Sequence, residues 1–185
     1  MARTYLIIKP DGMKFKKEVM TMLKSKYEII AVYELHNFCN IAVELYLDEE
    51  AIQRGNLPII FGINHIWRNI YKIEKAILLI LESRAECSQY NFIMEVCHFK
   101  KKYRSEHIEN GYVEYEISPQ EIDYTYDKTC FVHDFDYKRL DNSTNTYFLQ
   151  VNALHCPDTV ESYEREIKIL KKYIVNQQHE NYNRS

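Results

Sequence analysis

The hydrophobic positions at the start of the chain change from a strand period to a helix period and back. Residues 4–8 (TYLII) form a short apolar run, and residues 9–12 (KPDG) follow with a turn sequence, because proline sets φ and glycine permits a positive φ. Val19 and Leu23 then fall at helical spacing, and residues 27–35 (YEIIAVYEL) are apolar and β-branched. The pattern predicts strand, helix and strand in that order.

The next part of the chain has helical periodicity and then a second apolar run. Residues 41–71 are interrupted at residues 54–58 (RGNLP), where glycine and proline predict breaks between two or three short helices. Residues 75–81 (KAILLIL) form a continuous apolar run, which is typical of a strand in a covered sheet. A further helix is predicted over residues 84–99.

The stretch from residue 100 to residue 145 differs in composition, being charged, rich in tyrosine and poor in aliphatic side chains. With Pro119 and the polar run at residues 141–145 (DNSTN), it predicts an elaborated loop region with one or two hairpin strands. Residues 147–154 (YFLQVNAL) regain strand character and lead directly to His155.

A closing amphipathic helix follows. Asp158 and Glu161 have the spacing of a capping box, and apolar residues recur at steps of three and four from residue 160 to residue 174. The order βαβ, helices, βα, irregular segment, βα predicts an α+β sandwich with helices packed on an antiparallel sheet.

Length and composition indicate one hydrophobic core. The chain has 185 residues, of which 46% are hydrophobic, enough for one core and too few for two domains of ordinary size. We therefore expect a single domain over residues 1–175, with an atypical insertion at residues 100–145 and a flexible C-terminal tail at residues 176–185.

Charge, hydropathy and cysteine usage exclude several classes of protein. A net charge of −3 argues against a nucleic-acid partner held by phosphate contacts. No window is apolar enough for a membrane span, and the opening apolar run is too short for a signal peptide. The five cysteines are scattered and odd in number, which indicates neither a disulfide framework nor a zinc site. We expect a cytoplasmic protein without a membrane partner and without a metal site of its own.

The first segment with chemical potential is the turn at residues 9–12. A lysine at the end of a strand, followed by a rigid turn, is a cation on a stiff support, and such a cation suits contact with phosphate oxygens. Lys9 is therefore a candidate phosphate ligand. The alternative is a surface lysine beside an ordinary turn.

The second segment surrounds His155, which lies three residues before the expected start of the closing helix. Helix N-termini favour anions, so a phosphate bound there would lie near the imidazole. With an ordinary pKa of about 6.5, a histidine is mostly neutral at pH 7 and can act as a nucleophile. Glu166 lies eleven positions later and is placed to hold the ring. The alternative is a capping loop with an incidental histidine.

Together the two segments resemble the nucleoside diphosphate kinase family. Members begin with a strand that runs into Ile-Lys-Pro-Asp-Gly, which stands intact here at residues 8–12. Near the end they carry Asn-x-x-His-Gly-Ser-Asp-Ser-Val-Glu-Ser-Ala-x-x-Glu-Ile. The matching positions here are Asn152, His155, Asp158, Val160, Glu161, Ser162, Glu166 and Ile167. The resemblance implies the ferredoxin-like antiparallel sheet (βαββαβ) of that family, with helices packed on it.

The resemblance also implies a ping-pong phosphotransferase that uses nucleoside triphosphates and diphosphates with Mg²⁺. His155 would carry the phosphoryl group, and Lys9 would contact phosphate. Asn152 would contact ribose and phosphate, and Glu166 would orient His155. Tyr46 matches a tyrosine near the active histidine, or else packs in the core. Family members form homo-oligomers, so we expect a homo-oligomer or a larger protein complex.

Two departures from the family pattern concern the phosphate clamp and the residues after the histidine. Residues 132–135 (VHDF) replace an Arg-Gly-Asp-Phe sequence, so its arginine is missing. Arg84, Arg104 or Arg139, and a protonated His133, are candidate replacements; the alternative is that they are solvated surface residues.

Glycine and serine after the histidine are replaced by Cys156 and Pro157, and proline has no N–H to donate. These changes leave two functions open. One is a nucleotide phosphotransferase with a phosphohistidine at position 155. The other is a protein of low or no activity that keeps the fold, binds nucleotide and acts through partner contacts.

Overall fold

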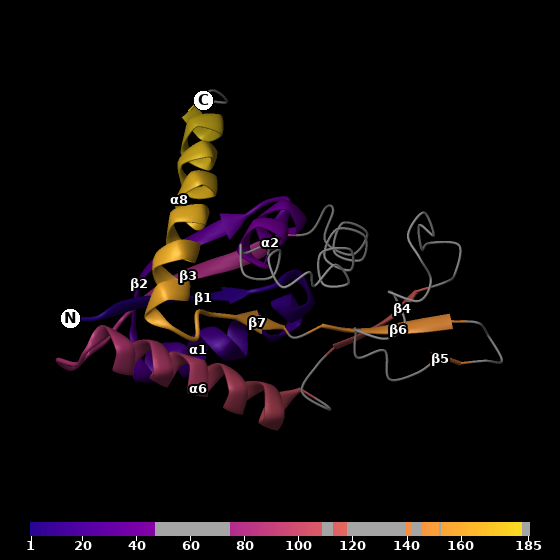
Figure 1. Cartoon of the computed structure of the whole chain (residues 1–185), viewed down its shortest axis with the longest axis horizontal. Helices are drawn as coiled ribbons and strands as arrows, with labels where there is room; N and C mark the ends of the chain where they lie inside the picture. The colour runs from indigo at the N-terminus through magenta and orange to yellow at the C-terminus, as the bar shows by residue number, and fades with distance from the viewer. Residues whose placement is uncertain (47–74, 109–112, 118–139, 142–145, 152, 183–185) are drawn as a thin grey trace.

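The computed structural model describes residues 1–46, 75–108, 113–117, 140–141, 146–151 and 153–182. Their helices and strands are shown in Figure 1. In chain order they are β1 (Arg3–Ile8), the 3₁₀ helix η1 (Pro10–Phe15), α1 (Lys16–Lys26), β2 (Glu28–Leu35), α2 (Phe38–Tyr46), β3 (Ala76–Glu82), α6 (Gln89–His107), β4 (Val113–Ile117), β5 (Leu140–Asp141), β6 (Thr146–Val151), β7 (Leu154–His155) and α8 (Val160–Tyr182).

The main sheet is antiparallel and four-stranded, in the order β2-β3-β1-β7. β1 occupies an inner position, where it pairs with β3 from Arg3 to Ile8 and with β7 at Ile7 and Ile8. Taken with α1 and α6, these strands follow the βαββαβ order of a ferredoxin-like fold. The predicted α+β class and antiparallel sheet are confirmed.

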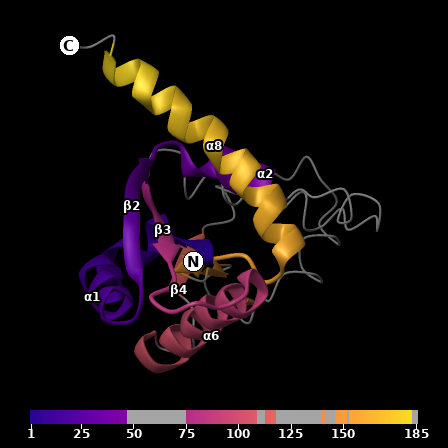
Figure 2. The ribbon, with the colours of Figure 1, turned by 90° about the vertical axis from the view of Figure 1, so that its left-hand side faces the viewer.

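Helices cover both faces of this sheet, which explains the continuous apolar runs in β1 and β3. Alternate side chains of each strand point to opposite faces, so a strand buried on both faces has no polar side. One core cluster joins Leu6 and Ile8 to α1 and α6. The other joins Tyr5 and Ile7 to α2 and α8. Figure 2 shows α8 and α2 on one side of the sheet and α1 and α6 on the other.

The structure also contains a separate three-stranded sheet, in the order β4-β6-β5. The prediction of one continuous strand over residues 147–154 is therefore wrong. That stretch is divided between two sheets. β6 pairs with β4 from Val113 to Ile117, whereas β7 pairs with β1 in the main sheet. Because β6 and β7 are separated only by residues 152–153, local strand propensity does not reveal the change of sheet.

Both long helices extend beyond their predicted ends. α6 begins after the N-cap Ser88, whose side chain accepts a hydrogen bond from the Asn91 amide, and continues to His107. The first residues of the predicted insertion are therefore helical. α8 continues to Tyr182, so part of the predicted C-terminal tail is helical as well. The predicted helices after Tyr46 lie outside the described residues.

The cap of α8 lies one residue later than predicted. The Ser162 amide donates to Thr159 Oγ1 at 3.0 Å, and the Thr159 amide donates to Ser162 Oγ at 3.0 Å. This reciprocal pair is a capping box built by Thr159 and Ser162 instead of Asp158 and Glu161. It sets where the first turn of α8 begins, and therefore where Glu166 lies relative to His155.

Candidate functional site

The two segments singled out at opposite ends of the chain lie side by side. His155 is paired with Ile7 in the β1–β7 ladder, and the Lys9 amide donates to the Ala153 carbonyl at 2.9 Å. Backbone hydrogen bonds thus hold the turn that carries Lys9 against the strand that carries His155.

Gly12 allows this close approach. A Cβ at position 12 would overlap the Ala153 carbonyl oxygen, so any larger residue would push the turn away from the second segment. The sequence suggested a positive φ as the reason for glycine in this turn. The structure instead shows a 3₁₀ turn, in which the Gly12 amide donates to the Lys9 carbonyl, and the requirement is space.

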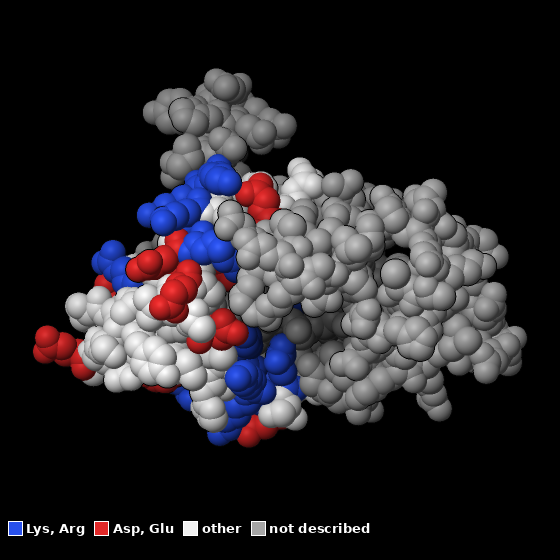
Figure 3. All heavy atoms as spheres, in the orientation of Figure 1, with Lys and Arg blue, Asp and Glu red and all other residues white. Residues whose placement is uncertain are grey.

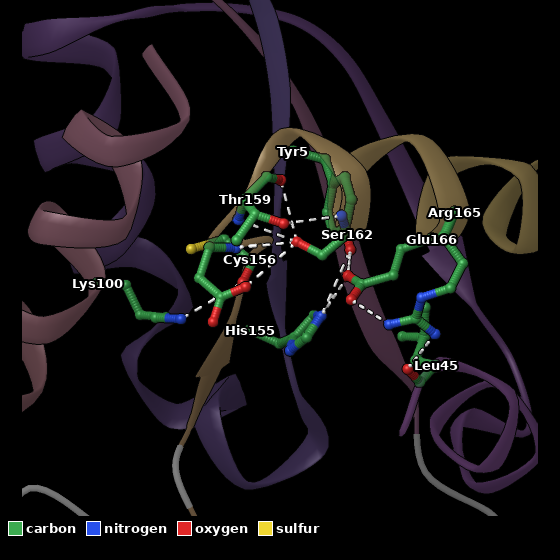
Figure 4. Close-up of polar contacts among 10 residues, drawn as sticks. Tyr5, Leu45, Lys100, His155, Cys156, Thr159, Ser162, Arg165 and Glu166 are labelled. Atoms are coloured by element: carbon green, nitrogen blue, oxygen red, sulfur yellow. Dashed lines mark hydrogen bonds and ion pairs between the residues drawn. The ribbon is translucent and has the colours of Figure 1, made fainter. Parts of the chain in front are cut away.

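His155 is held on one side by a carboxylate from α8. Its Nε2 lies 2.9 Å from Glu166 Oε2 and 3.4 Å from the Tyr5 hydroxyl, which itself donates to Glu166 Oε2 (Figure 4). A carboxylate only accepts hydrogen bonds, so this contact assigns the hydrogen to Nε2. The remaining ring nitrogen, Nδ1, then carries the lone pair.

Glu166 is itself anchored on its other oxygen. Arg165 Nη2 lies 3.0 Å from Glu166 Oε1, and Arg165 Nη1 donates to the Leu45 carbonyl near the C-terminal end of α2 at 2.9 Å. Glu166 is buried, so these bonds replace the water that the carboxylate loses. The orientation of the ring therefore depends on contacts between α8, β1 and α2.

Lys9 is a buried cation, with 2% of its surface exposed. Burial lowers the pKa of Lys9, and the nearby Asp11 carboxylate opposes that effect. Arg104 and Lys100, both from α6, lower the Lys9 pKa further because they repel its positive charge. Three cations from two distant parts of the chain thus lie close enough to interact.

The environment of His155 favours the neutral imidazole. Burial lowers its pKa below the ordinary value, while the hydrogen bond to Glu166 and the charge of Glu166 raise it. Lys100 and Lys9 lower it again through charge repulsion. The net direction is downward, so the ring is uncharged and nucleophilic at neutral pH.

Cys156, the residue after His155, contacts α6 through its side chain and its backbone. Its thiol lies close enough to that of Cys97 to change the pKa of that thiol, and Lys100 Nζ donates to the Cys156 carbonyl at 3.3 Å. The contact with Cys156 lowers the pKa of Cys97 to about 6. Both cysteines are buried in the core shared with α6, so they also pack β7 against that helix.

The structure brings together four of the predicted site residues and separates one. Lys9, His155 and Glu166 converge at the junction of β1, β7 and α8, and Arg104 lies within electrostatic reach of Lys9. Arg84 lies beyond the other end of β1, which is about 20 Å long, and donates to the Lys24 and Ser25 carbonyls at the end of α1.

The remaining predicted residues are not located by the structure. Asn152, His133 and Arg139 lie outside the described residues, as does the side chain of Tyr46 at the end of α2. Their proposed roles stay predictions.

Sequence reasoning missed Tyr5, Arg165 and Lys100. Tyr5 shares a strand face with Ile7, which faces α2 and α8, but only the β1–β7 register shows that it meets His155. Arg165 directly precedes Glu166 and gave no motif signal. Lys100 was assigned to the irregular insertion because α6 was predicted to end at residue 99.

The described residues contain neither a candidate metal cluster nor a candidate membrane-spanning helix. Among them, no group of three or more His, Cys, Asp or Glu side chains is arranged to hold a metal ion. In the same part of the chain, no helix combines the length and apolarity that crossing a membrane requires.

Comparison with known proteins identifies the fold. No protein-family model matches this sequence, and no curated protein matches it. Among solved structures, an NDP kinase from Pyrobaculum aerophilum matches with a TM-score of 0.51 and 15% identity, covering 94% of this chain and 98% of that one. The Aquifex aeolicus nucleoside diphosphate kinase aligns with a TM-score of 0.47 and 17% identity, over 91% of this chain and 94% of that one. The likeness to the Pyrobaculum structure, together with the four-stranded antiparallel sheet, shows an NDP kinase-like fold.

Proposed function

We propose that this protein is a nucleotide phosphotransferase that moves the γ-phosphate of a nucleoside triphosphate to a nucleoside diphosphate through a phosphohistidine on His155. The observation that carries the proposal is the convergence of a buried lysine with a partly buried, carboxylate-held imidazole. These are the two groups that phosphoryl transfer to histidine requires, a cation for the phosphates and an oriented nucleophile.

In the first half-reaction, His155 Nδ1 attacks the γ-phosphorus and the bond to the β–γ bridging oxygen breaks, so the nucleoside diphosphate leaves with that oxygen. The Nε2–H stays in place and donates to Glu166 Oε2. Because the ring becomes positive when Nδ1 bonds to phosphorus, the Glu166 carboxylate stabilises the charged product.

In the second half-reaction, a terminal phosphate oxygen of another nucleoside diphosphate attacks the same phosphorus. The N–P bond breaks, its electrons return to Nδ1, and the neutral ring is regenerated. Burial favours this neutral form, as the lowered pKa of His155 indicates.

Lys9 neutralises phosphate charge in both half-reactions. Its burial keeps water away from the cation, which strengthens its interaction with an anion. The nucleotide enters as its Mg²⁺ complex, and Mg²⁺ bound through substrate phosphates needs few protein ligands. The described residues suit such a substrate because they offer cations to the phosphates.

A nucleotide-binding protein with little turnover is the second candidate function. It is favoured by buried Pro157, which cannot donate a backbone hydrogen bond just before the N-terminus of α8. A protein of this kind would act through partner contacts and would not need an efficient second half-reaction.

A labelling experiment tests the proposal. The protein is incubated with γ-labelled ATP and Mg²⁺, and acid-labile label is then chased with GDP. Wild-type protein should become labelled and should lose the label to GDP, whereas His155→Ala should not become labelled. His98→Ala removes an exposed histidine of α6 and should behave as wild type. Label that persists in His155→Ala would exclude this nucleophile. ATP binding without label in wild type would favour the binding protein.

A further inference from the structure

Two cations of α6 lie on the side of that helix that faces the candidate site. Lys100 and Arg104 are four residues apart, so they occupy the same face of the helix. Both are half-buried, whereas the neighbouring Lys101 and Lys102 are exposed. Figure 3 shows Lys and Arg side chains gathered over the C-terminal part of α6.

Lys100 is positioned by a direct contact with the residue after His155. Its Nζ donates to the Cys156 carbonyl at 3.3 Å, and Figure 4 shows it on the side of His155 opposite to Arg165. A lysine Nζ has three donors, so a single bond to a carbonyl leaves capacity for an anion.

Three positively charged side chains, Lys9, Lys100 and Arg104, interact electrostatically at this point. Lys100 and Arg104 both repel buried Lys9, and Lys100 also acts on His155. Like charges held together in a partly buried place cost stability unless an anion balances them. Asp11 is the carboxylate that acts most strongly on Lys9. Three cations therefore exceed the negative charge that the turn at residues 9–12 supplies.

We infer that Lys100 and Arg104 bind the polyphosphate of the nucleoside di- and triphosphate substrates, together with Lys9. The inference rests on the proposed function, and it assigns to α6 the positive charge that the sequence at residues 132–135 lacks. The bridging and terminal phosphates lie between α6 and the His155 ring, and the number of phosphates sets how much these cations contribute to binding.

A phosphate-number series tests the inference. Wild type, Lys100→Gln, Arg104→Gln and the control Lys101→Gln are titrated by calorimetry with AMP and with the Mg²⁺ complexes of ADP and ATP. Lys100→Gln keeps a donor for the Cys156 carbonyl but removes the charge. We expect a loss of about 10-fold or more for ATP in each site variant, a smaller loss for ADP, and a change within about twofold for AMP. Lys101→Gln should match wild type throughout.

The titration results distinguish phosphate binding by the charge of Lys100 and Arg104 from a purely structural role of these side chains. An equal loss for AMP, ADP and ATP would make Lys100 a structural link to β7 and overturn its assignment, and unchanged ATP binding in both variants would overturn the whole inference. Lys100→Arg should restore most of the affinity for ATP if the charge matters. If Lys100→Gln does not fold, the inference is tested with Arg104→Gln alone. An ATP affinity of Arg104→Gln equal to that of wild type would then overturn the inference.

A second probe keeps the inference distinct from the proposed function. Inorganic tripolyphosphate carries the charge of the substrate without its base and sugar. If wild type fails to form phosphohistidine but binds tripolyphosphate, with a loss of about 10-fold in Arg104→Gln, the anion site stands and the transferase proposal fails. If wild type labels on His155 and both variants label at the same rate, the transferase proposal stands and the anion site fails.

Discussion

The site has two sides that differ in how their charges are balanced. On the α8 side, Glu166 is bonded to His155, Tyr5 and Arg165, so its negative charge has partners on both oxygens. On the α6 side, Lys100 and Arg104 repel Lys9. The α8 side holds the ring in one orientation, whereas the α6 side brings positive charges together, as expected of the anion site inferred above.

This contrast has a physical basis. A group that must keep its orientation is best held by a completed set of hydrogen bonds, since each bond removes a rotational alternative. A group that must bind a charged substrate is best left with unbalanced charge, since full pairing would compete with the substrate. Changes on the two sides should therefore affect different properties of the protein.

The largest effect is expected for Lys9→Met. Removing the buried cation should slow phosphohistidine formation by about 10³-fold, because an equivalent loss of a phosphate-neutralising charge has that order of cost. Stability should stay the same or rise, because methionine avoids the desolvation of a buried ammonium group. Rapid-quench labelling and thermal unfolding check the two parts, with exposed Lys14→Met as the control. An active Lys9→Met protein would show that Lys9 does not neutralise phosphate charge in the reaction.

Glu166→Gln should have the next largest effect. The amide keeps the size of the side chain but cannot neutralise the positive phosphorylated ring, so labelling should slow by about 10²-fold. ATP affinity should change little, because the α8 side holds the ring and does not bind the phosphates. Glu164→Gln changes an exposed neighbour on α8 and serves as the control. A loss confined to ATP affinity would reverse the roles of the two sides.

Gly12→Ala should destabilise the junction on which both sides depend. The added methyl group would overlap the Ala153 carbonyl, and overpacking of this kind costs about 1–3 kcal/mol. Urea unfolding should show this loss, while Lys14→Ala in the same 3₁₀ helix should change stability by under about 0.5 kcal/mol. Wild-type stability in Gly12→Ala would mean that the turn can move away from β7 without cost.

The smallest effect is a dependence of stability on pH. The folded-state pKa of His155 lies below the unfolded value of about 6.5, so the unfolded chain binds more protons in acid. The stabilisation is present above pH 6.5 and is lost as pH falls through the folded pKa. Urea unfolding between pH 5 and pH 8 should show the loss, and His155→Asn should reduce the slope. An unchanged slope in the variant would assign the dependence to other histidines.

Much of the main sheet was predictable from the sequence. The strands at residues 4–8, 27–35 and 75–81 have apolar patterns that match β1, β2 and β3, because burial selects side chains position by position. The closing helix was predictable for the same reason. The change of sheet between β6 and β7 was not, since both strands have the same local preference and only their partners differ.

The residues of the candidate site also fall into two groups, those that the sequence predicted and those that it did not. His155 and Glu166 were predictable as a pair because they are close in sequence and carry a motif, and Lys9 was predictable because its turn carries another. Tyr5, Arg165 and Lys100 were not, because their roles arise from contacts with residues 56 to 161 positions away or from a helix whose end was misplaced.

The sequence alone determined the α+β class, the buried strands and the candidate pair of His155 and Glu166, because each depends on local composition and spacing. Tertiary structure decided that Lys9 lies beside His155, through the β1–β7 ladder and the space at Gly12. It also decided which cations face the site. Lys100 and Arg104 differ from Lys101 and Lys102 only in the face of α6 that they occupy, and the packing of that helix on the sheet selects the face.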